Sequence, residues 1–296
     1  YANPENEKIL KAFLTNELPD VEVSVSSDVC PEIREYERFT TTVVNAYIKP
    51  LMSNYLKKLD QKLLNSGFNC PLLLMTSGGT LTNISSACNN PVRLVESGPA
   101  GGAILATSIA EDMNLSKVIS FDMGGTTAKI TIIENKKAIK AREFEVDRKA
   151  RFKKGSGYPL RIPVIEMVEI GAGGGSIARV NKLEQIITGP DSAGSFPGPA
   201  CYSNGGSMPT ITDADLVIGK INPDNFAGGK IKLSKQLADK AITENIVKFV
   251  NIDTNIAALA ISEIVDETMS NAARVHTVEQ GHETSNRTLI AFGGAA

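Results

Sequence analysis

The stretch of sequence that decides the fold reads Val118-Ile119-Ser120-Phe121-Asp122-Met123-Gly124-Gly125-Thr126-Thr127-Ala128-Lys129-Ile130-Thr131-Ile132-Ile133. Two apolar, β-rich segments flank an Asp-x-Gly-Gly-Thr-Thr turn, and this pattern predicts a β-hairpin. The two glycines permit positive φ angles and let main-chain N–H groups approach a ligand. Those N–H groups, the two threonine hydroxyls and the Asp122 carboxylate suit a phosphate and its metal ion. On this stretch alone, an ordinary glycine hairpin whose aspartate caps its own turn is the alternative.

Five further motifs, most of them rich in glycine, occur elsewhere in the chain. They are Ser97-Gly98-Pro99-Ala100-Gly101-Gly102, Ile170-Gly171-Ala172-Gly173-Gly174-Gly175-Ser176-Ile177-Ala178, Gly198-Pro199-Ala200-Cys201-Tyr202, Thr212-Asp213-Ala214-Asp215-Leu216-Val217-Ile218-Gly219 and Ala291-Phe292-Gly293-Gly294-Ala295-Ala296. With these motifs in this order, the chain from about residue 30 to residue 296 is similar to the hydantoinase A/oxoprolinase family. The segment from Phe121 to Lys129 resembles the second phosphate loop of that family.

The resemblance implies an α/β fold of the actin-like, ribonuclease-H-like ATPase type, with mixed β-sheets flanked by helices. It implies that residues 1–96 are the end of a first lobe and residues 97–296 a second lobe. The second lobe would hold the phosphate hairpin 118–133 and a glycine-rich loop region at 171–207.

The family includes ATP-dependent N-methylhydantoinase, 5-oxoprolinase and the acetone carboxylase beta subunit. Its members use ATP to open cyclic amides such as hydantoin or 5-oxoproline, or to activate ketones for carboxylation. We expect a hydrolase acting on a cyclic amide, with the ATP-using subunit of a ketone carboxylase or a non-catalytic nucleotide-binding module as alternatives. The expected partners are the small cyclic amide and a second, unrelated enzyme subunit, because family members often work with one.

ATP and Mg²⁺ are the cofactors that the resemblance implies. We expect Asp122 to be the catalytic residue and the metal ligand, since a hard cation beside phosphate needs an oxygen anion. The residues expected to bind the nucleotide are Gly124, Gly125, Thr126, Thr127, Gly173, Gly174, Gly175, Gly293 and Gly294. The run Gly173-Gly174-Gly175 would place N–H donors around an anion, and Gly293-Gly294 would begin the turn on the adenosine side. Only one Asp-x-Gly-Gly-Thr hairpin is present, so we expect half of a catalytic cleft and weak binding of ATP by the isolated chain.

Composition sets broad limits on the function. The 296 residues suffice for one large domain or two smaller ones, and a net charge of −2 gives no argument for nucleic-acid or membrane binding. Four widely spaced cysteines and the lack of a secretory signal favour a reduced, cytoplasmic setting. No apolar run approaches the ~20 residues that span a bilayer. Because the chain begins at Tyr1 and stops inside a glycine motif, we expect a fragment of a longer protein.

The N-terminal third is predicted to be mainly helical. The pattern predicts a short helix at Glu5–Glu17, a strand at Val21–Val25 and, from Pro31 to Asn65, a long amphipathic helix or helix pair that Pro50 kinks or divides. Its apolar positions are Tyr36, Phe39, Val43, Tyr47, Leu51, Tyr55, Leu59 and Leu63. The polar positions Arg38, Thr41, Thr42 and Asn45 would lie on a solvated face or line a cleft.

Further elements are predicted from hydrophobic periodicity. They are a buried strand at 71–76 with a glycine turn at 77–80, a helix at 98–113, strands at 162–170, 176–180 and 289–292, and helices at 234–250 and 252–279. Residues 136–154 carry nine basic side chains, which indicate a solvated surface hairpin or an anion-binding arm.

Four other residues carry reactive or charged side chains for which a functional and a structural role can be weighed. Asp213 is expected to cap the following helix, with a metal role as the alternative. Cys201 is expected to be a buried structural thiol rather than a nucleophile, and His282 after Gly281 is expected to close a helix. Lys129 is expected to point outward from its strand, with a role beside the phosphates as the alternative.

Overall fold

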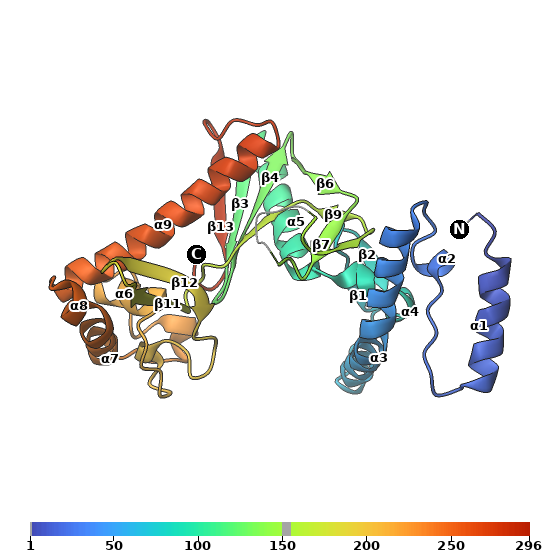
Figure 1. Ribbon diagram of the computed structural model, residues 1–296, viewed down its shortest axis with the longest axis horizontal. Coiled ribbons are helices and arrows are strands. Elements are labelled where there is room, and N and C mark those ends of the chain that lie inside the picture. The colour runs from blue at the N-terminus through green and yellow to red at the C-terminus, as the bar shows by residue number, and fades with distance from the viewer. Residues whose placement is uncertain (1, 150–154) are drawn as a thin grey trace. The chain divides into compact units, whose positions relative to one another are not determined.

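The structure is a computed structural model that describes residues 2–149 and 155–296 (Figure 1). The chain forms two compact units. The first unit comprises the residues up to Ser108 together with Ala138–Glu166, and the second comprises Ile109–Lys137 and Met167–Ala296. Both units combine helices with small sheets, so the predicted α/β fold with mixed sheets flanked by helices is confirmed. None of the described helices is long and apolar enough to cross a membrane.

The first unit is built around one long helix. Its helices are α1 (Glu5–Glu17), α2 (Ser26–Val29), α3 (Glu35–Asn65), α4 (Ile84–Asn89) and the beginning of α5 (Ser97–Asp112), with a 3₁₀ turn at Pro91–Leu94. The strands in its described residues form three antiparallel pairs, which are β1 (Leu73–Met75) with β2 (Leu81–Asn83), β6 (Lys140–Ala141) with β9 (Val164–Ile165), and β7 (Phe144–Val146) with β8 (Tyr158–Leu160).

Helix α3 is oriented differently from the sequence prediction. It continues through Pro50 as one helix, and its buried residues are Arg38, Thr41, Asn45, Ser53 and Leu56. Most of the apolar positions predicted to form the inner face, from Tyr36 to Tyr55, are exposed instead. The polar side chains face inward because they have partners there. The Asn45 amide donates to Ser24 Oγ (3.2 Å) and to the Asn89 carbonyl (3.1 Å).

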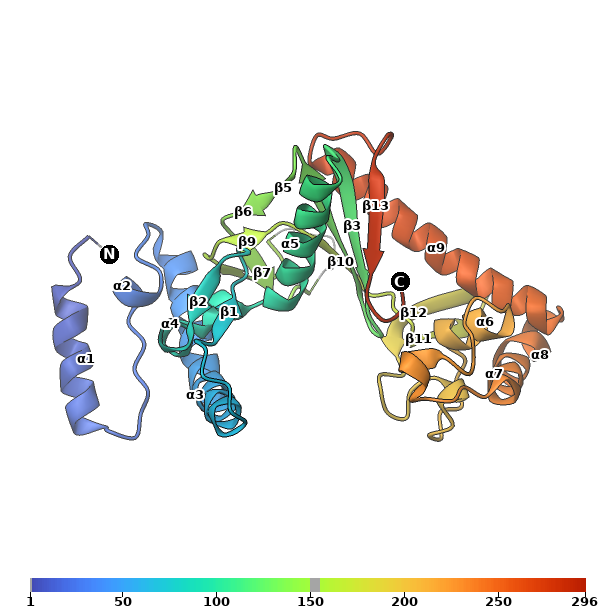
Figure 2. The ribbon, with the colours of Figure 1, turned by 180° about the vertical axis from the view of Figure 1, so that it is seen from behind.

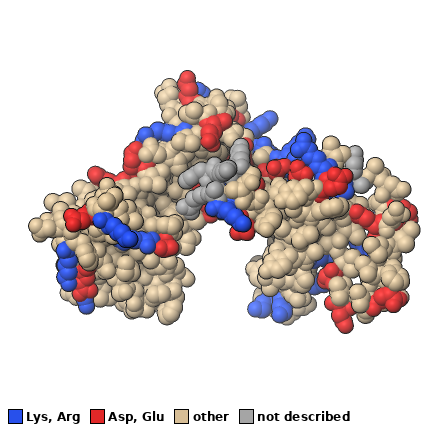
Figure 3. Space-filling view, viewed as in Figure 1, with Lys and Arg blue, Asp and Glu red and all other residues tan. Residues whose placement is uncertain are grey.

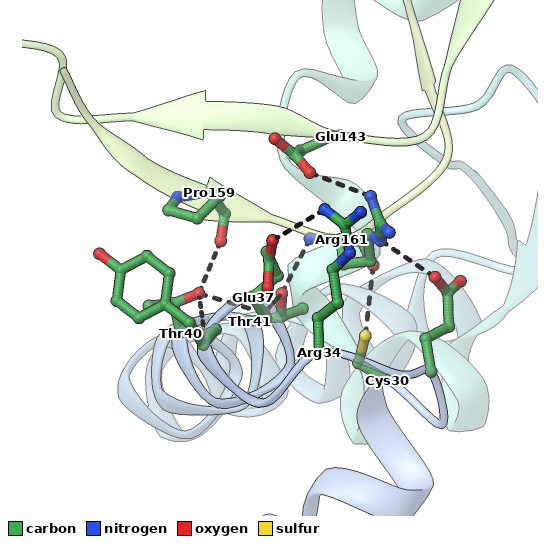
Figure 4. Close-up of polar contacts among 10 residues, drawn as sticks. Cys30, Arg34, Glu37, Thr40, Thr41, Glu143, Pro159 and Arg161 are labelled. Atoms are coloured by element: carbon green, nitrogen blue, oxygen red, sulfur yellow. Dashed lines mark hydrogen bonds and ion pairs between the residues drawn. The ribbon is translucent and has the colours of Figure 1, made fainter. Parts of the chain in front are cut away.

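The β8 strand and the residue after it are fastened to α3 by polar contacts (Figure 4). Thr41 Oγ1 accepts a hydrogen bond from the Arg161 N–H at 2.8 Å, and Thr40 Oγ1 donates to the Pro159 carbonyl at 2.7 Å. The Arg161 guanidinium contacts Glu32 at 3.1 Å and Glu143 at 3.0 Å. The buried threonine and asparagine of α3 are therefore structural, and they form neither a solvated face nor a cleft.

Two predicted strands in this unit were misjudged. Residues 21–25 form no strand, and β1 is only partly buried. The 21–25 segment is held by side chains instead. Lys49 donates to Glu22 at 2.8 Å, and this hydrogen bond and the lysine charge lower the pKa of Glu22. Alternation of apolar and polar residues predicts a strand only where another strand is available for pairing.

The second unit contains the predicted hairpin. Strands β3 (Lys117–Met123) and β4 (Ala128–Glu134) pair antiparallel, and β5 (Lys137–Ala138), β10 (Val168–Ile170) and β13 (Thr288–Phe292) complete a mixed sheet of order β10-β4-β3-β13 with β5 on β4. Strand β13 runs parallel to β3 (Figure 2). Helix α9 (Thr254–Glu279) covers one sheet face, where Val265 and Met269 pack with Met123 and Ile130.

The rest of the second unit forms a separate core. It consists of the antiparallel pair β11 (Ser176–Val180) and β12 (Ile186–Ser192), helix α6 (Ile211–Val217), helix α7 (Lys235–Ile242), a π-helical turn at Thr243–Val247, the short α8 (Lys248–Val250), and 3₁₀ turns at Ala200–Tyr202 and Phe226–Gly229. These elements bury Ala178, Cys201, Leu216, Ile242 and Ile261. The region 171–207 is thus ordered, as predicted, although the sequence did not reveal β12.

Surface charge gives no evidence of a single-sign field. Basic and acidic side chains alternate over the face seen in Figure 3, in keeping with the net charge of −2. Within the basic segment 136–154, residues 150–154 lie outside the described part of the chain. The described residues form ion pairs such as Arg148 with Glu145 at 3.2 Å, which favours a surface segment.

The contact between Thr41 and Arg161 gives the first prediction. Thr41→Val removes a buried acceptor and leaves the Arg161 N–H unpaired, so we expect the free energy of unfolding to fall by about 1–3 kcal/mol. Thr42→Val is the matched control, because the Thr42 hydroxyl bonds only within its own helix, to the Arg38 carbonyl. Urea unfolding measures both. Equal losses for the two variants would contradict the role assigned to Thr41.

Candidate functional site

The turn between β3 and β4 presents unengaged polar groups. The Gly124 N–H donates to the Thr127 carbonyl at 3.0 Å and closes the turn. Within residues 2–149 and 155–296, the N–H groups of Gly125 and Thr126 have no acceptor, and the hydroxyls of Thr126 and Thr127 have no partner. Gly125 and Thr126 are exposed. The turn therefore offers several donors to a ligand.

Asp122 lies at the end of β3 and is partly buried. Its carboxylate makes no hydrogen bond or ion pair with any described residue, so the alternative that it caps its own turn is not supported. No three His, Cys, Asp or Glu side chains of the described residues are grouped to hold a metal ion. Asp122 is thus the one carboxylate at this turn that would hold a Mg²⁺ ion, which often binds through one or two protein carboxylates together with substrate phosphates.

The loop Gly173-Gly174-Gly175 lies directly behind the turn. The Gly174 N–H donates to the Gly124 carbonyl (3.1 Å), and the Gly175 N–H donates to the Gly125 carbonyl (2.7 Å). The Gly173 N–H donates to Ser176 Oγ at 2.9 Å. We expected these three N–H groups to surround an anion, but each already donates a hydrogen bond within the protein. The loop therefore supports the turn from behind.

Close packing explains why this loop is made of glycines. A Cβ on Gly173 would lie 2.6 Å from the Thr126 nitrogen and 2.7 Å from the Gly124 oxygen. Main-chain atoms of a braced turn cannot move aside for a methyl group. The sequence pattern predicted N–H donors for an anion in this loop, and the structure shows these donors bonded within the protein.

The C-terminal glycines reach the same end of the sheet. The Ala295 N–H donates to the Met123 carbonyl at 3.0 Å. Gly293 has φ of 106°, and a Cβ there would collide with the Met123 oxygen and lie 2.8 Å from Asp122 Oδ1. Gly293 and Gly294 are exposed. The structure therefore brings together the three glycine segments that were expected to bind the nucleotide.

A row of charged residues crosses the sheet beside the turn. Asp122 on β3 is in register with Lys129 on β4, and Lys129 is in register with Glu169 on β10. The Lys129 side chain is only 15% exposed, and its Nζ lies 3.9 Å from Glu169. Register partners lie on the same sheet face with Cβ atoms about 5 Å apart. The prediction that Lys129 points outward is wrong, because its side chain shares the face of Asp122.

Helix α6 anchors the glycine loop from the far side. The N–H and the hydroxyl of Thr212 both donate to the Gly174 carbonyl at 2.8 Å. Thr210 is the N-cap, and Asp213 completes a capping box. Asp213 also accepts the N–H groups of Ala200 (3.1 Å) and Cys201 (2.7 Å). It helps to cap the helix, as expected, and its filled acceptor sites give no support to a metal role.

Sequence reasoning missed the supporting role of Thr212 and the capping role of Thr210. The signal was present, since Thr210-x-x-Asp213 before an apolar run has the spacing of a capping box. Asp215, two residues beyond, accepts from Ser262 Oγ at 2.9 Å, and burial raises the pKa of this carboxyl.

Cys201 and His276 are buried, and His282 lies at the end of a helix. Burial raises the pKa of the Cys201 thiol, which agrees with the prediction of an inert buried cysteine. His276 is buried within α9. The His282 N–H donates to the Thr277 carbonyl at 3.0 Å after Gly281 at φ 74°, so this residue helps to close α9 as predicted.

Comparison with known proteins identifies the family. The profile described as hydantoinase/oxoprolinase matches residues 38–296. The chain belongs to the hydantoinase/oxoprolinase family. The resemblance seen in the sequence motifs is thereby confirmed.

Relatives of this hydantoinase/oxoprolinase chain include proteins with and without an assigned activity. An uncharacterized protein of Methanocaldococcus jannaschii is 43% identical over 100% of this chain and 44% of the relative. Caprolactamase subunit alpha of Pseudomonas jessenii is 35% identical over 99% of this chain and 41% of the relative. The chain therefore spans less than half the length of these relatives.

Solved structures in the family show the same fold. The nucleotide-free structure of acetone carboxylase, described as catalysing ATP-dependent acetone carboxylation, superposes with a TM-score of 0.83 at 26% identity. It covers 98% of this chain, which matches 40% of that chain. The crystal structure of the ATP-dependent caprolactamase from Pseudomonas jessenii gives a TM-score of 0.77 at 34% identity, with shares of 98% and 41%.

The close packing behind the turn can be tested with a matched pair of glycine variants. Gly173→Ala forces a methyl group against the turn's main chain, so we expect the free energy of unfolding to fall by about 1–3 kcal/mol. Gly125→Ala is the control, because a Cβ at Gly125 meets nothing within 4 Å. Thermal unfolding compares the two. A Gly125→Ala variant as unstable as Gly173→Ala would contradict the packing described.

Thiol labelling tests the surroundings of the cysteines. Because burial raises the pKa of Cys201, its thiol stays protonated at mildly alkaline pH and reacts slowly, whereas Cys70 is exposed. Iodoacetamide followed by mass spectrometry should find Cys70 modified in the native chain and all four cysteines modified after unfolding. Rapid labelling of Cys201 in the native chain would contradict a buried, unreactive thiol and favour a nucleophilic cysteine.

Proposed function

We propose that this chain supplies the phosphate-binding turn of an ATP-dependent hydrolase that opens a cyclic amide of the hydantoin or 5-oxoproline type. The supporting observation is that the turn's N–H groups and hydroxyls, and the Asp122 carboxylate at the end of β3, have no partner among the described residues. The caprolactamase relative is described as ATP-dependent, and its name identifies a cyclic amide as its substrate.

The chemistry requires activation because an amide carbonyl is a poor electrophile. Transfer of the γ-phosphoryl group of ATP to the carbonyl oxygen turns that oxygen into a leaving group. ADP is released in this transfer. One water then adds to the carbon, and the ring C–N bond breaks as the nitrogen takes up a proton, which leaves an acyl phosphate. A second water hydrolyses the acyl phosphate to the carboxylate of the opened product and free phosphate. In phosphoryl transfer the protein chiefly positions the reacting groups and neutralises charge.

Each residue of the turn has a proposed part in this reaction. The N–H groups of Gly125 and Thr126 and the hydroxyls of Thr126 and Thr127 hold phosphate oxygens. Asp122 holds Mg²⁺, which when bound neutralises charge on the phosphates. Lys129, in register with Asp122, adds a positive charge on the same face. Gly293 and Gly294 provide an exposed turn at the side of the nucleotide.

A ketone carboxylase subunit is the second candidate. The TM-score of 0.83 with acetone carboxylase, whose carboxylation of acetone is described as ATP-dependent, favours it. The relatives named as subunits, including caprolactamase subunit alpha and acetone carboxylase beta subunit, support a second subunit as partner in either case.

A phosphate-release assay on the full-length protein separates these functions. We expect MgATP hydrolysis that depends on one member of a panel of hydantoin, 5-oxoproline and caprolactam. Hydrolysis that requires a simple ketone and bicarbonate together would select the carboxylase instead. An absence of turnover with every compound, despite nucleotide binding, would favour a non-catalytic module and contradict the proposal.

Asp122→Asn tests the assigned metal ligand. Loss of the carboxylate charge should lower the rate of substrate-dependent ATP hydrolysis by at least about 100-fold while the fold is retained. Asp224→Asn is the control, since the Asp224 side chain is 75% exposed and pairs only with Lys232 at 3.8 Å. Initial rates at several Mg²⁺ concentrations measure the effect. Unchanged turnover in Asp122→Asn would remove the central residue of the proposal.

A further inference from the structure

Three charged residues lie side by side on one face of the sheet in the second unit, one on each of three neighbouring strands. Asp122 on β3, Lys129 on β4 and Glu169 on β10 are directly opposite one another in register. Side chains in register on neighbouring strands share a face, with Cβ atoms about 5 Å apart. The row therefore places one cation between two carboxylates.

The lysine in the middle of the row is opposite both carboxylates but pairs with only one of the two. Its Nζ lies 3.9 Å from Glu169 Oε1, and its side chain is 15% exposed. Within the described part of the chain, Asp122 forms no ion pair with it. The Asp122 carboxylate lies toward its other neighbour, β13, because a Cβ on Gly293 would be 2.8 Å from Asp122 Oδ1. The ammonium and the Asp122 carboxylate thus lie toward opposite edge strands of the sheet.

The position of Glu169 is fixed by its strand. Val168 and Ile170, its neighbours in β10, pack into the core beneath α9, so the Glu169 side chain lies on the other face of the sheet. A few residues further on, the N–H groups of Gly174 and Gly175 donate to the turn between β3 and β4. The strand that carries Glu169 is therefore attached to the same turn that offers donors to a phosphate.

We propose that Glu169 is a positioning residue, which holds the Lys129 ammonium away from Asp122 and so keeps that carboxylate available to Mg²⁺. This inference rests on the proposed phosphate-binding function. An aspartate directly opposite a lysine attracts its ammonium, and an ammonium paired with a carboxylate competes with a metal ion for the same oxygens. Because the lysine stem is flexible, a second carboxylate on a fixed strand decides which partner the ammonium takes. Held at Glu169, the ammonium still adds positive charge to the proposed phosphate site.

The test measures how strongly Mg²⁺ promotes nucleotide binding by the full-length protein. Isothermal titration calorimetry gives the dissociation constant of a non-hydrolysable ATP analogue in EDTA and in the presence of Mg²⁺. The ratio of the first constant to the second reports the metal contact and cancels the direct effect of Lys129 on the phosphates. We expect Glu169→Gln to lower this ratio by at least about 10-fold, because Lys129 then pairs with Asp122. Glu267→Gln is the control and should leave the ratio unchanged, since Glu267 is also ion-paired, with Arg274 at 3.5 Å, but lies on α9.

A double variant separates positioning from a merely structural role of Glu169. Lys129→Met removes the ammonium and keeps an apolar stem. Combined with Glu169→Gln it removes an electrically neutral pair, so the ratio should return to within about threefold of the value for the unaltered protein. The Glu169 side chain is 50% exposed, so the change to Gln should leave the fold intact, which circular dichroism checks.

The outcomes distinguish this inference from the proposed function. An unchanged ratio in Glu169→Gln, together with clear promotion by Mg²⁺ in the unaltered protein, would overturn the positioning role alone. Equal losses in the single and the double variant would also overturn it, because Lys129 would then have no part in the effect. If Mg²⁺ does not promote binding in the unaltered protein, the metal site of the proposed function is wrong, and this inference is overturned with it.

Discussion

The fit between two glycine segments is the constraint on which the second unit depends. The N–H groups of Gly174 and Gly175 donate to the carbonyls of Gly124 and Gly125, which draws those oxygens to the back of the turn. Among the described residues, the N–H groups of Gly125 and Thr126 have no acceptor. A side chain at Gly173 would collide with the same main-chain atoms. The position of Asp122 relative to these donors follows from this arrangement.

The remainder of the second unit holds this arrangement in place. Thr212 fixes the Gly174 carbonyl, and the buried Asp213 joins the start of α6 to the segment that contains Cys201. These residues belong to the packed core, so their polar groups are satisfied within the protein and take no part in the proposed chemistry. In the proposed mechanism the groups that contact the phosphates all lie at the turn, which suits a reaction in which positioning and charge neutralisation do most of the catalytic work.

Sequence reasoning succeeded where the pattern is local. The hairpin, α1 and β11 have the predicted positions because turn glycines and periodicity act within a few residues. It failed where the partner is distant in sequence. The inner face of α3 is polar because Asn45 hydrogen-bonds to Asn89 and Thr41 to Arg161. The local sequence around α3 contains no pattern from which these distant partners could be predicted. The glycine loop lies against the turn, and its Gly174 and Gly175 N–H groups donate to the turn's carbonyls, which only the three-dimensional contacts reveal.

The account's central claim is that the turn between β3 and β4 binds the phosphates of a nucleotide. A titration of the ¹⁵N-labelled chain with MgATP, followed by amide chemical shifts, tests it most directly. Weak, saturable shifts should appear first at Gly125, Thr126 and Thr127, with smaller shifts at Gly293 and Gly294, and none should appear in Asp122→Asn at the same concentrations. Shifts confined to other parts of the chain, or equal shifts in Asp122→Asn, would contradict the account.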